Sequence, residues 1–528
     1  MMKKVIKKLL AALLAVAMVC AMAIPAFAYN PGETKEDLNT KHDYGAFQIF
    51  EGVISKDNET LSDVNWGQNI TEPDIFLANL KNDPTIGEKF ETAATAQDVL
   101  AVISKWHDSD DNSIAFARVV CHYLYPDANA NPTPVATDHT GGINIPKSGY
   151  YLIVDTSTFS DDDFYHAYNS FFLLNVPQTP YVVLVNHKVV KPTVEKEVYD
   201  NNDIGSTGGW GSSADHAINE PFQFRLIAKL PASENNGRAY DYYKEYAVCF
   251  TDTLSDGITF DKLDTVEITN GDGSTPQGIN NYTLDPNNPQ SSFKLSIDDV
   301  KTCVPDLNKG ATITVTYTAH LNEKAYVNTV GGGTDNKNSV YLEYSNNPRI
   351  STSLDHTTTS EVCVYTYQLN NTKHQDSENG PVLEGAGFRL YSNEACNAED
   401  EIKLKMNDDG TYSRDFSTEG KGVEMLSNKD GQFNVKGLDA GTYYLKETTP
   451  PTGYSACANK EIVISATHDV NHVDLSGNLS TTIINKKAGG ITLPSTGGIG
   501  TTIFYVVGGG LMVAAIVLLV TKKRMENK

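Results

Sequence analysis

The sequence is poor in positive charge and in cysteine, and each scarcity excludes a class of protein. Lys and Arg number 42 against 66 Asp and Glu, giving a formal net charge of −24. Nucleic acids and anionic lipids attract basic surfaces, so a chain this acidic is not expected to bind either. The 7 Cys include no Cys-x-x-Cys pair and no accompanying His cluster, so no metal site is expected. We find no catalytic nucleophile constellation, and we expect neither an enzyme nor a cofactor.

The rest of the composition favours several β-rich domains. A chain of 528 residues exceeds one ordinary hydrophobic core, and about three domains are expected. Hydrophobic residues make up 40% and charged residues 20%, as in globular proteins. The 27 Tyr and 19 Phe, with many Val, Thr and Ile, favour strands. A cytosolic α/β enzyme is therefore not expected.

Both ends of the chain carry targeting features. Four Lys precede an apolar run over residues 9–24, and a small-x-small site closes residues 26–28. This order is typical of a secretory signal, removed after Ala28. At the other end, an apolar stretch over residues 503–520 is followed by a basic tail and is just long enough to span a bilayer. The exported body is more acidic than the whole chain, because both ends are basic.

A pentapeptide directly precedes the C-terminal apolar stretch. It consists of Leu493, Pro494, Ser495, Thr496 and Gly497. The pentapeptide in this place resembles a sortase sorting signal of Gram-positive bacteria. The resemblance implies that a sortase attacks the Thr496 carbonyl, releases Gly497 onward and transfers the acyl group to an amine. Pro494 fixes φ and favours an extended, accessible substrate segment. A lasting single-pass membrane anchor is the alternative.

The chain between the two ends divides into three expected domains. The ranges are 1–28 for the signal peptide, 29–187 and 188–350 for the first two domains, 351–488 for the third, and 489–528 for the sorting signal. In the first domain, strand-like runs flank a helical insertion, where Thr95 and Asp98 have the pattern of a helix N-cap. In the other two, short alternating runs separated by Gly, Asn and Asp predict tandem immunoglobulin-like β-sandwiches.

Several runs resemble one family. In the first domain "HDYGAFQIFEG" and "SGYYLIVDT" resemble the N-terminal domain of Gram-positive backbone pilins. In the third, "GPVLEGAGFRLY" and "GTYYLKETTPPTGY" look like a Cna B-type domain, and Tyr443-x-Leu445-x-Glu447-Thr448 matches that family's E-box. The chain as a whole resembles a sortase-assembled major pilin subunit with isopeptide-forming domains.

The resemblance implies a spontaneous Lys–Asn isopeptide bond in each of the last two domains. The third domain would use Lys373, the acid Glu447 and Asn485. The second would use Lys196, the acid Asp252 and Asn346, although Lys191, Asn338 and Asn347 compete for these roles. Surface Lys and Asn residues beside an ordinary salt-bridged acid are the alternative.

The chemistry explains why these three residue types are needed together. A free Lys, with a pKa near ~10.4, is almost wholly charged and is no nucleophile. Burial lowers the pKa of the amine and raises the pKa of the carboxyl group, so the amine is freed and the acid can polarise the Asn carbonyl. Proximity holds the amine against the Asn side chain so that the two react, and ammonia leaves.

Polymerisation by a sortase needs a second amine. The family's pilin motif, Trp-x-x-x-Val-x-Val-Tyr-Pro-Lys, aligns with residues 179–188, where Val183, Val185 and Lys188 match and the Trp, Tyr and Pro positions differ. The resemblance makes Lys188 the expected acceptor, with Lys191 in reserve. An exposed linker Lys is the alternative.

Six Cys remain after removal of the signal peptide, an even count that permits disulfides in an exported protein. Two pairs lie within single expected domains, Cys249 with Cys303 and Cys396 with Cys457. We therefore expect these two disulfides, while an anaerobic habitat would leave the thiols reduced.

Together these features predict a cell-wall-anchored surface protein. The expected function is the structural subunit of a covalent pilus that supports adhesion. Its partners would be identical subunits, sortase, peptidoglycan, minor pilins and a host surface ligand, but no nucleic acid. The alternative is a wall-anchored adhesin that is attached singly and binds a host or microbial ligand.

Overall fold

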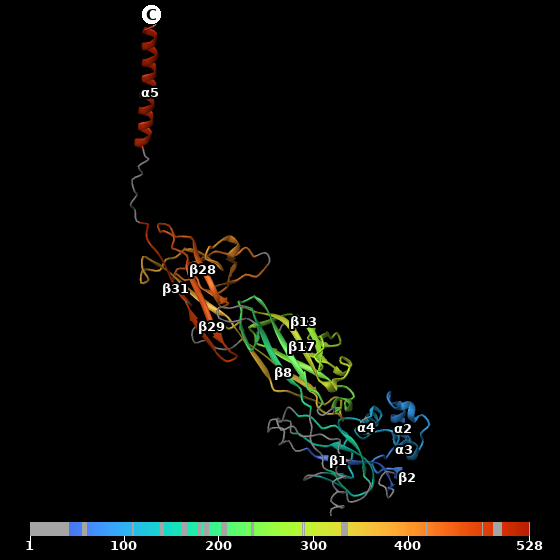
Figure 1. Ribbon diagram of the computed structural model, residues 1–528. Helices are drawn as coiled ribbons and strands as arrows, with labels where there is room; N and C mark the ends of the chain where they lie inside the picture. Colours follow the sequence, from blue (N-terminus) through green and yellow to red (C-terminus); the bar gives the residue numbers. More distant parts are fainter. Residues whose placement is uncertain are drawn as a thin grey trace, which may run out of the picture.

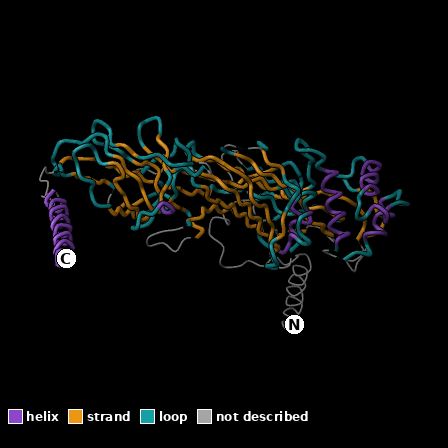
Figure 2. The backbone as a smooth tube through the Cα atoms, turned by 90° about the horizontal axis from the view of Figure 1, so that it is seen from above, coloured by secondary structure: helices purple, strands orange, loops and turns teal. Residues whose placement is uncertain are grey.

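Three β-rich bodies follow one another along an elongated molecule in the computed structural model (Figure 1). The structure describes residues 42–54, 61–107, 110–137, 142–159, 166–176, 181–183, 190–201, 209–233, 237–287, 289, 291–328, 336–417, 420–477, 479–488 and 499–526. The signal peptide, the sorting pentapeptide and Lys188 lie outside these residues. The view from above shows the helices gathered near one end of the molecule and at the C-terminus (Figure 2).

The first body combines a sheet with a helical insertion, as the sequence predicts. Its main sheet has the order β2-β1-β5-β6, with β3 pairing with β1, while β4 and β7 form a separate pair. The helix at 96–103 begins with a capping box, in which Thr95 and Asp98 bond each other's backbone. The elements are β1 (Tyr44–Ile54), β2 (Leu61–Trp66), α2 (Pro73–Asn82), η1 (Gly87–Phe90), α3 (Ala96–Ile103), α4 (Asp111–Leu124), β3 (Ala136–Thr137), β4 (Ile143–Ile145), β5 (Gly149–Asp155), β6 (Phe172–Val176) and β7 (Tyr181–Val183).

The second body is a sandwich of two sheets around one large core. One sheet has the order β14-β13-β17-β11-β8-β9, and the other has the order β10-β20-β18-β12-β16-β15, with β19 beside β18. The strands are β8 (Thr193–Asp200), β9 (Gly209–Gly211), β10 (Ser213–Asp215), β11 (Pro221–Leu230), β12 (Val248–Leu254), β13 (Ile258–Asn270), β14 (Gln277–Gly278), β15 (Thr283–Asp285), β16 (Phe293–Ile297), β17 (Ala311–Leu321), β18 (Lys337–Ser345), β19 (Leu354–His356) and β20 (Ser360–Tyr365), with short 3-10 turns η3 (Ala239–Tyr242), η4 (Val300–Thr302) and η5 (Leu307–Lys309).

Strand alternation builds this core. Every second residue of β17 is buried and every other one is partly exposed, as a half-buried strand requires. Polar side chains at inward positions of such strands must therefore find partners inside the sandwich.

The third body is also a two-sheet sandwich. Its sheets have the orders β24-β25-β27-β21-β31 and β23-β22-β28-β29-β30, with β26 beside β22. The elements are β21 (Tyr367–Gln375), β22 (Gly387–Tyr391), η6 (Ala398–Asp400), β23 (Glu401–Ile402), β24 (Leu404–Met406), β25 (Tyr412–Arg414), β26 (Met425–Leu426), β27 (Val435–Leu438), β28 (Gly441–Thr449), β29 (Lys460–His468), β30 (Val473–Gly477) and β31 (Ser480–Asn485).

The border between the second and third bodies lies later than the sequence predicts. Strand β20 pairs antiparallel with β18 and parallel with β10, both in the second body. Strand β19 also pairs with β18. Residues 354–365, expected in the third domain, therefore complete a sheet of the second, and the third begins with β21.

A single long helix, α5 (Ile499–Glu526), follows the third body and projects from it (Figure 1). Its segment Tyr505–Met525 has a mean hydropathy of 2.0, and none of the 18-residue window that gives this value is buried against the rest of the protein. The helix is long and apolar enough to cross a membrane, in agreement with the expected C-terminal anchor.

Candidate functional site: two buried lysine–acid–asparagine clusters

In the third body, the first and last strands bring a Lys and an Asn together. Strands β21 and β31 run parallel as neighbours, with Gln375 opposite Asn485. The Lys373 Nζ lies 2.5 Å from the Asn485 Oδ1 and 3.5 Å from the Glu447 Oε1. The Asn485 Nδ2 donates to the same Glu447 oxygen at 2.7 Å. The structure thus places all three residues predicted for this domain in one cluster.

The surroundings of this cluster are apolar and closed. The side chains of Lys373 and Glu447 are fully buried, and so is Asn485. The Lys373 Nζ lies 5.6 Å from the ring centroid of Phe388, which stacks on Phe433. Burial lowers the pKa of Lys373, while the Glu447 carboxylate opposes that change. The other Glu447 oxygen accepts the backbone N–H of Cys457 at 2.7 Å, which fixes the carboxyl group.

In the second body, the Lys and the acid come from facing sheets. Lys196 on β8 lies in one sheet and Asp252 on β12 in the other, and the Lys196 Nζ bonds the Asp252 Oδ2 directly. Both side chains are fully buried. The hydroxyl of Tyr317 bridges them, at 3.2 Å from the Lys196 Nζ and 3.2 Å from the Asp252 Oδ1. The same hydroxyl accepts the Nδ2 of Asn338 at 2.6 Å.

Burial sets the protonation of this second cluster. Desolvation lowers the pKa of Lys196 to about 8, against the opposing attraction of Asp252. Desolvation raises the pKa of Asp252, although Lys196 and Tyr317 oppose the rise. The Lys196 Nζ also lies 5.4 Å from the ring centroids of Phe224 and Tyr317. The two shifts bring the amine and the acid closer in proton affinity, so a proton can pass between them at low cost.

The structure places the asparagine predicted for this domain outside the cluster. Asn346 lies just beyond the end of β18, where its Oδ1 accepts from Ser353 at 2.7 Å. Asn338 instead lies on β18 opposite Leu254, two residues along β12 from Asp252. It is fully buried, and its Oδ1 has no hydrogen-bond partner. The register of β12 and β18 therefore brings Asn338, and not Asn346, to the Tyr317 hydroxyl that bridges the lysine and the acid.

Sequence reasoning missed Tyr317 altogether. The only signal for it was the alternation of β17, which places Tyr317 on the inward face. The expected acceptor Lys188 and residues 493–497 lie outside the described residues. The reserve acceptor Lys191 lies half-buried just before β8.

The expected disulfides are absent, since none of the six cysteines that the structure describes is bonded to another. In the second body, the Cys249 Sγ accepts from Ser296 at 3.2 Å, and Cys303 ends a 3-10 turn. In the third, the Cys396 Sγ accepts from Asn459 at 3.3 Å. Sharing a domain does not bring two thiols together, because a disulfide also requires close and correctly oriented Cβ atoms.

This arrangement predicts that the exported chain, denatured without reductant, gives six reactive thiols in a colorimetric thiol titration. The same titration after reduction should give the same number, because there is no disulfide to open. A higher count after reduction would contradict the free-thiol structure.

Comparison with known proteins identifies two parts of the chain. Residues 369–478 match the model of the SpaA prealbumin-like fold domain, and residues 485–527 match the LPXTG cell wall anchor motif. The first match includes two members of the third-body cluster, Lys373 and Glu447, and Asn485 is the first residue of the second match. No curated protein is similar to the chain at a significant level.

Solved structures of pilins are similar to larger parts of the chain. The T6 backbone pilin of Streptococcus pyogenes is 16% identical over 85% of this chain and 96% of its own, with a TM-score of 0.46. The major pilin SpaD of Corynebacterium diphtheriae is 20% identical over 69% of this chain and 88% of its own, with a TM-score of 0.41. A C-terminal fragment of the Streptococcus agalactiae major pilin GBS80 is 20% identical over 56% of this chain and 99% of its own, with a TM-score of 0.39.

The assignment of the chain rests on the two matched segments, residues 369–478 and 485–527. The anchor motif at residues 485–527 coincides with the long apolar helix α5. The chain is a cell-wall-anchored surface protein of the Gram-positive type, with a SpaA-type prealbumin-like domain directly before its LPXTG anchor.

Proposed function

We propose that the chain is the backbone subunit of a covalently polymerised cell-surface pilus. The observation that carries this proposal is the third-body cluster, where a buried Lys, acid and Asn meet between the first and last strands. A second such cluster in the second body, the SpaA-type domain and the wall anchor support it. The role is structural, and the only chemistry is a cross-link made once per domain.

In the proposed reaction, the neutral amine of Lys373 attacks the side-chain carbonyl carbon of Asn485. A new N–C bond forms, the C–N bond to the amide nitrogen breaks, and that nitrogen leaves as ammonia. In the same reaction, Glu447 delivers a proton to the leaving nitrogen and receives one from the attacking amine, so the protons balance. The Lys373 Nζ lies 2.5 Å from the carbonyl oxygen of Asn485, and the Asn485 Nδ2 donates to Glu447 at 2.7 Å. The amine and the acid therefore both lie beside the amide, and this fixed geometry replaces an external catalyst.

The two cross-links would reinforce the chain differently. In the third body, the bond would join two neighbouring strands of one sheet, β21 and β31, which are the first and last of the domain. In the second body, a bond between Lys196 and Asn338 would join β8 of one sheet to β18 of the other. A pulling force would then meet a covalent bond between neighbouring strands in one domain and between the two sheets in the other.

Head-to-tail assembly would use the two ends of the body. A sortase would cleave after Thr496 and transfer its acyl group to Lys188 of another copy, with Lys191 in reserve. The partners of the chain would be identical subunits, sortase and peptidoglycan, with minor pilins and a host surface ligand in the adhesive fibre. The rival function, a singly attached adhesin, needs the anchor but not the acceptor lysine.

Mutation of the acceptor distinguishes these two functions. Lys188→Ala should collapse the high-mass forms of the wall-released protein to a single wall-attached species, as seen by immunoblotting after boiling in detergent. Lys191→Ala is the matched control and should leave the high-mass forms intact. If neither substitution, nor the two combined, changed the size of the wall-attached species, the polymer model would fail.

The protonation of the second-body cluster predicts a pH profile for cross-linking. The reactive form, with a neutral Lys196 and a protonated Asp252, carries the same number of protons as the ion pair of charged Lys196 and ionised Asp252. The ratio of these two forms therefore does not change with pH between the pKa values of the two groups. Above about pH 8, where Lys196 titrates, the pair loses a proton. The rate should then fall about tenfold per pH unit.

This profile can be measured on the Glu447→Gln variant, which leaves only the second-body reaction. The full chain, collected unfolded in denaturant, is refolded at fixed pH values, and ammonia loss is followed by intact mass. A rate that kept rising far above pH 8 would mean that the free amine alone limits the reaction and that the acid has no part in it.

A further inference from the structure

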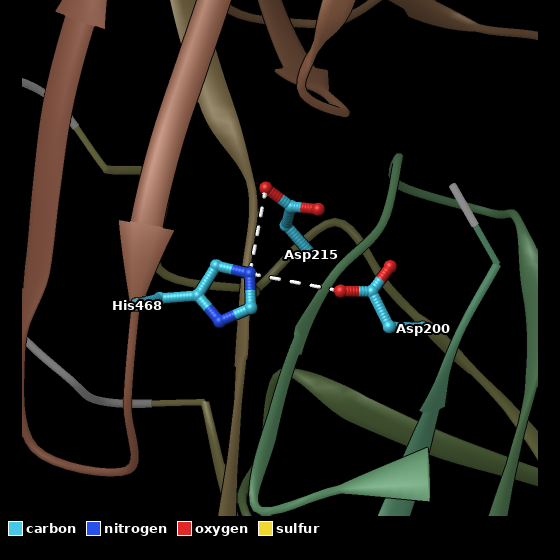
Figure 3. A group of neighbouring side chains, drawn as sticks. All are labelled: Asp200, Asp215 and His468. Carbon is cyan, nitrogen blue, oxygen red and sulfur yellow. Dashed lines mark ion pairs between the residues drawn. The ribbon is translucent and has the colours of Figure 1, made fainter. Parts of the chain in front are cut away.

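Two carboxylates and an imidazole meet where the second and third bodies join. Asp200 ends β8 and Asp215 ends β10 in the second body, while His468 ends β29 in the third. Figure 3 shows both carboxylates turned toward the imidazole. The His468 Nε2 lies 3.8 Å from an oxygen of each, and the three ligand atoms lie within 4.8 Å of one another.

No direct hydrogen bond joins the Nε2 of His468 to the Oδ2 of Asp200 or of Asp215. A separation of 3.8 Å between nitrogen and oxygen exceeds a hydrogen bond, which spans about 2.7–3.2 Å. Asp215 is only 1% exposed, and its Oδ1 has no hydrogen-bond partner. Two buried carboxylates that face each other repel unless a positive charge lies between them.

The surrounding contacts orient these groups as they do around a bound metal. The other ring nitrogen of His468, Nδ1, lies 2.9 Å from the Ser213 Oγ, and that hydroxyl is within donating distance of the His468 carbonyl at 3.3 Å. A hydroxyl that donates to the carbonyl accepts the proton of Nδ1, so that the Nε2 lone pair faces the carboxylates. The Tyr367 hydroxyl donates to the Asp215 Oδ2 at 2.7 Å. Supporting bonds of this kind fix the tautomer and the direction of metal ligands.

We propose that Asp200, Asp215 and His468 form a binding site for a divalent transition-metal ion, with Zn²⁺ as the best match. Zinc takes nitrogen and carboxylate oxygen at about 2.0–2.2 Å, so that neighbouring ligands of a tetrahedral ion lie about 3.3–3.6 Å apart. The two separations of 3.8 Å from Nε2 would close slightly around such an ion, and the two carboxylate oxygens, which lie within 4.8 Å of each other, would move together as well. Two negative charges and a neutral imidazole balance the ion, and a water molecule would complete the tetrahedron.

The sequence did not reveal this site because its ligands are far apart in the chain. The prediction of no metal site rested on the absence of a short Cys or His spacing. The ligands instead come from three strand ends in two bodies. A bound ion would fasten the third body to the second and so stiffen the joint, an effect independent of the isopeptide bonds.

The test is zinc retention by the full chain purified in detergent. The protein is stripped with EDTA, loaded with ZnCl₂ and freed of excess metal by gel filtration, and zinc per chain is measured by elemental mass spectrometry. His468→Gln and Asp215→Asn should each hold one zinc equivalent less than the wild type. His472→Gln is the matched control, because His472 is an exposed histidine on the turn that follows β29, and it should retain the full amount.

A second reading uses the wild-type protein alone and does not depend on a variant that folds. Loaded with Co²⁺, the site should give the visible absorption of a tetrahedral ion without the thiolate charge-transfer band that cysteine ligands would produce. Equal zinc in the wild type and both site variants, no retained zinc in the wild type, or a cobalt spectrum with thiolate bands would each overturn the proposal. If the protein retained no zinc, and the wild type and His468→Gln differed in melting temperature only at low pH, the cluster would be an ion pair and not a metal site.

Discussion

Glu447→Gln should leave the third body without its cross-link and greatly destabilise that domain. The substitution keeps the shape of the side chain but removes the proton that the leaving amide nitrogen needs. Lys373 and Asn485 are 112 residues apart, and a covalent bridge across such a loop is worth about 5 kcal/mol in the chain-entropy account. The uncompensated buried Lys373 adds to this loss, because its charge no longer has a carboxylate partner.

Intact mass and thermal melting measure the effect. The wild-type mass should fall short of the calculated value by two molecules of ammonia, and the Glu447→Gln mass by one. Glu461→Gln, the same change at an exposed position on the adjacent strand β29, should keep both the wild-type deficit and the wild-type melting temperature. A wild-type mass equal to the calculated value would end the cross-link hypothesis in both domains.

The second large effect is expected at Asn338. Asn338→Ala should abolish the second-body cross-link, reduce the mass deficit by one ammonia, and destabilise the domain by about 5 kcal/mol, because the loop from Lys196 is longer than that of the third body. Asn346→Ala removes only a side chain that bonds Ser353 outside the cluster. It should keep the full mass deficit.

Comparing the two variants decides which asparagine reacts, Asn338 as the structure indicates or Asn346 as predicted from the sequence. Each substitution removes the same atoms, so a difference between them reports the position alone. Loss of ammonia release in Asn346→Ala but not in Asn338→Ala would mean that the described register of β12 and β18 is not the one in which the reaction occurs.

The two clusters show which parts of a site can be predicted from the sequence. In the third domain, the E-box and the terminal strand fix Glu447 and Asn485 by motif, and the structure brings both to Lys373. In the second domain, the resemblance pointed to Lys196 and Asp252, which the structure brings together, but the choice of Asn depends on pairing between β12 and β18. A shift of one residue moves a side chain to the other face, and no local pattern in the sequence sets that register.

The local elements of the fold could be predicted from the sequence, whereas the contacts between distant parts of the chain could not. The capping box at Thr95, the alternating strands and the apolar C-terminal helix are local patterns, and all were confirmed. The border of the third body was misplaced because β20 follows a loop yet returns to the second-body sheet. The disulfide pairs and the cluster around His468 depend on long-range placement of side chains, which composition and spacing do not determine.

The most direct test of the proposed function is the size of the wild-type protein on the cell wall. Wall proteins are released with a muralytic enzyme, boiled in detergent and reductant, and immunoblotted for this chain. A covalent pilus subunit should give a ladder of bands far above the monomer. A single band near the mass of one chain would contradict the polymer and leave a singly anchored surface protein whose ligand must then be sought.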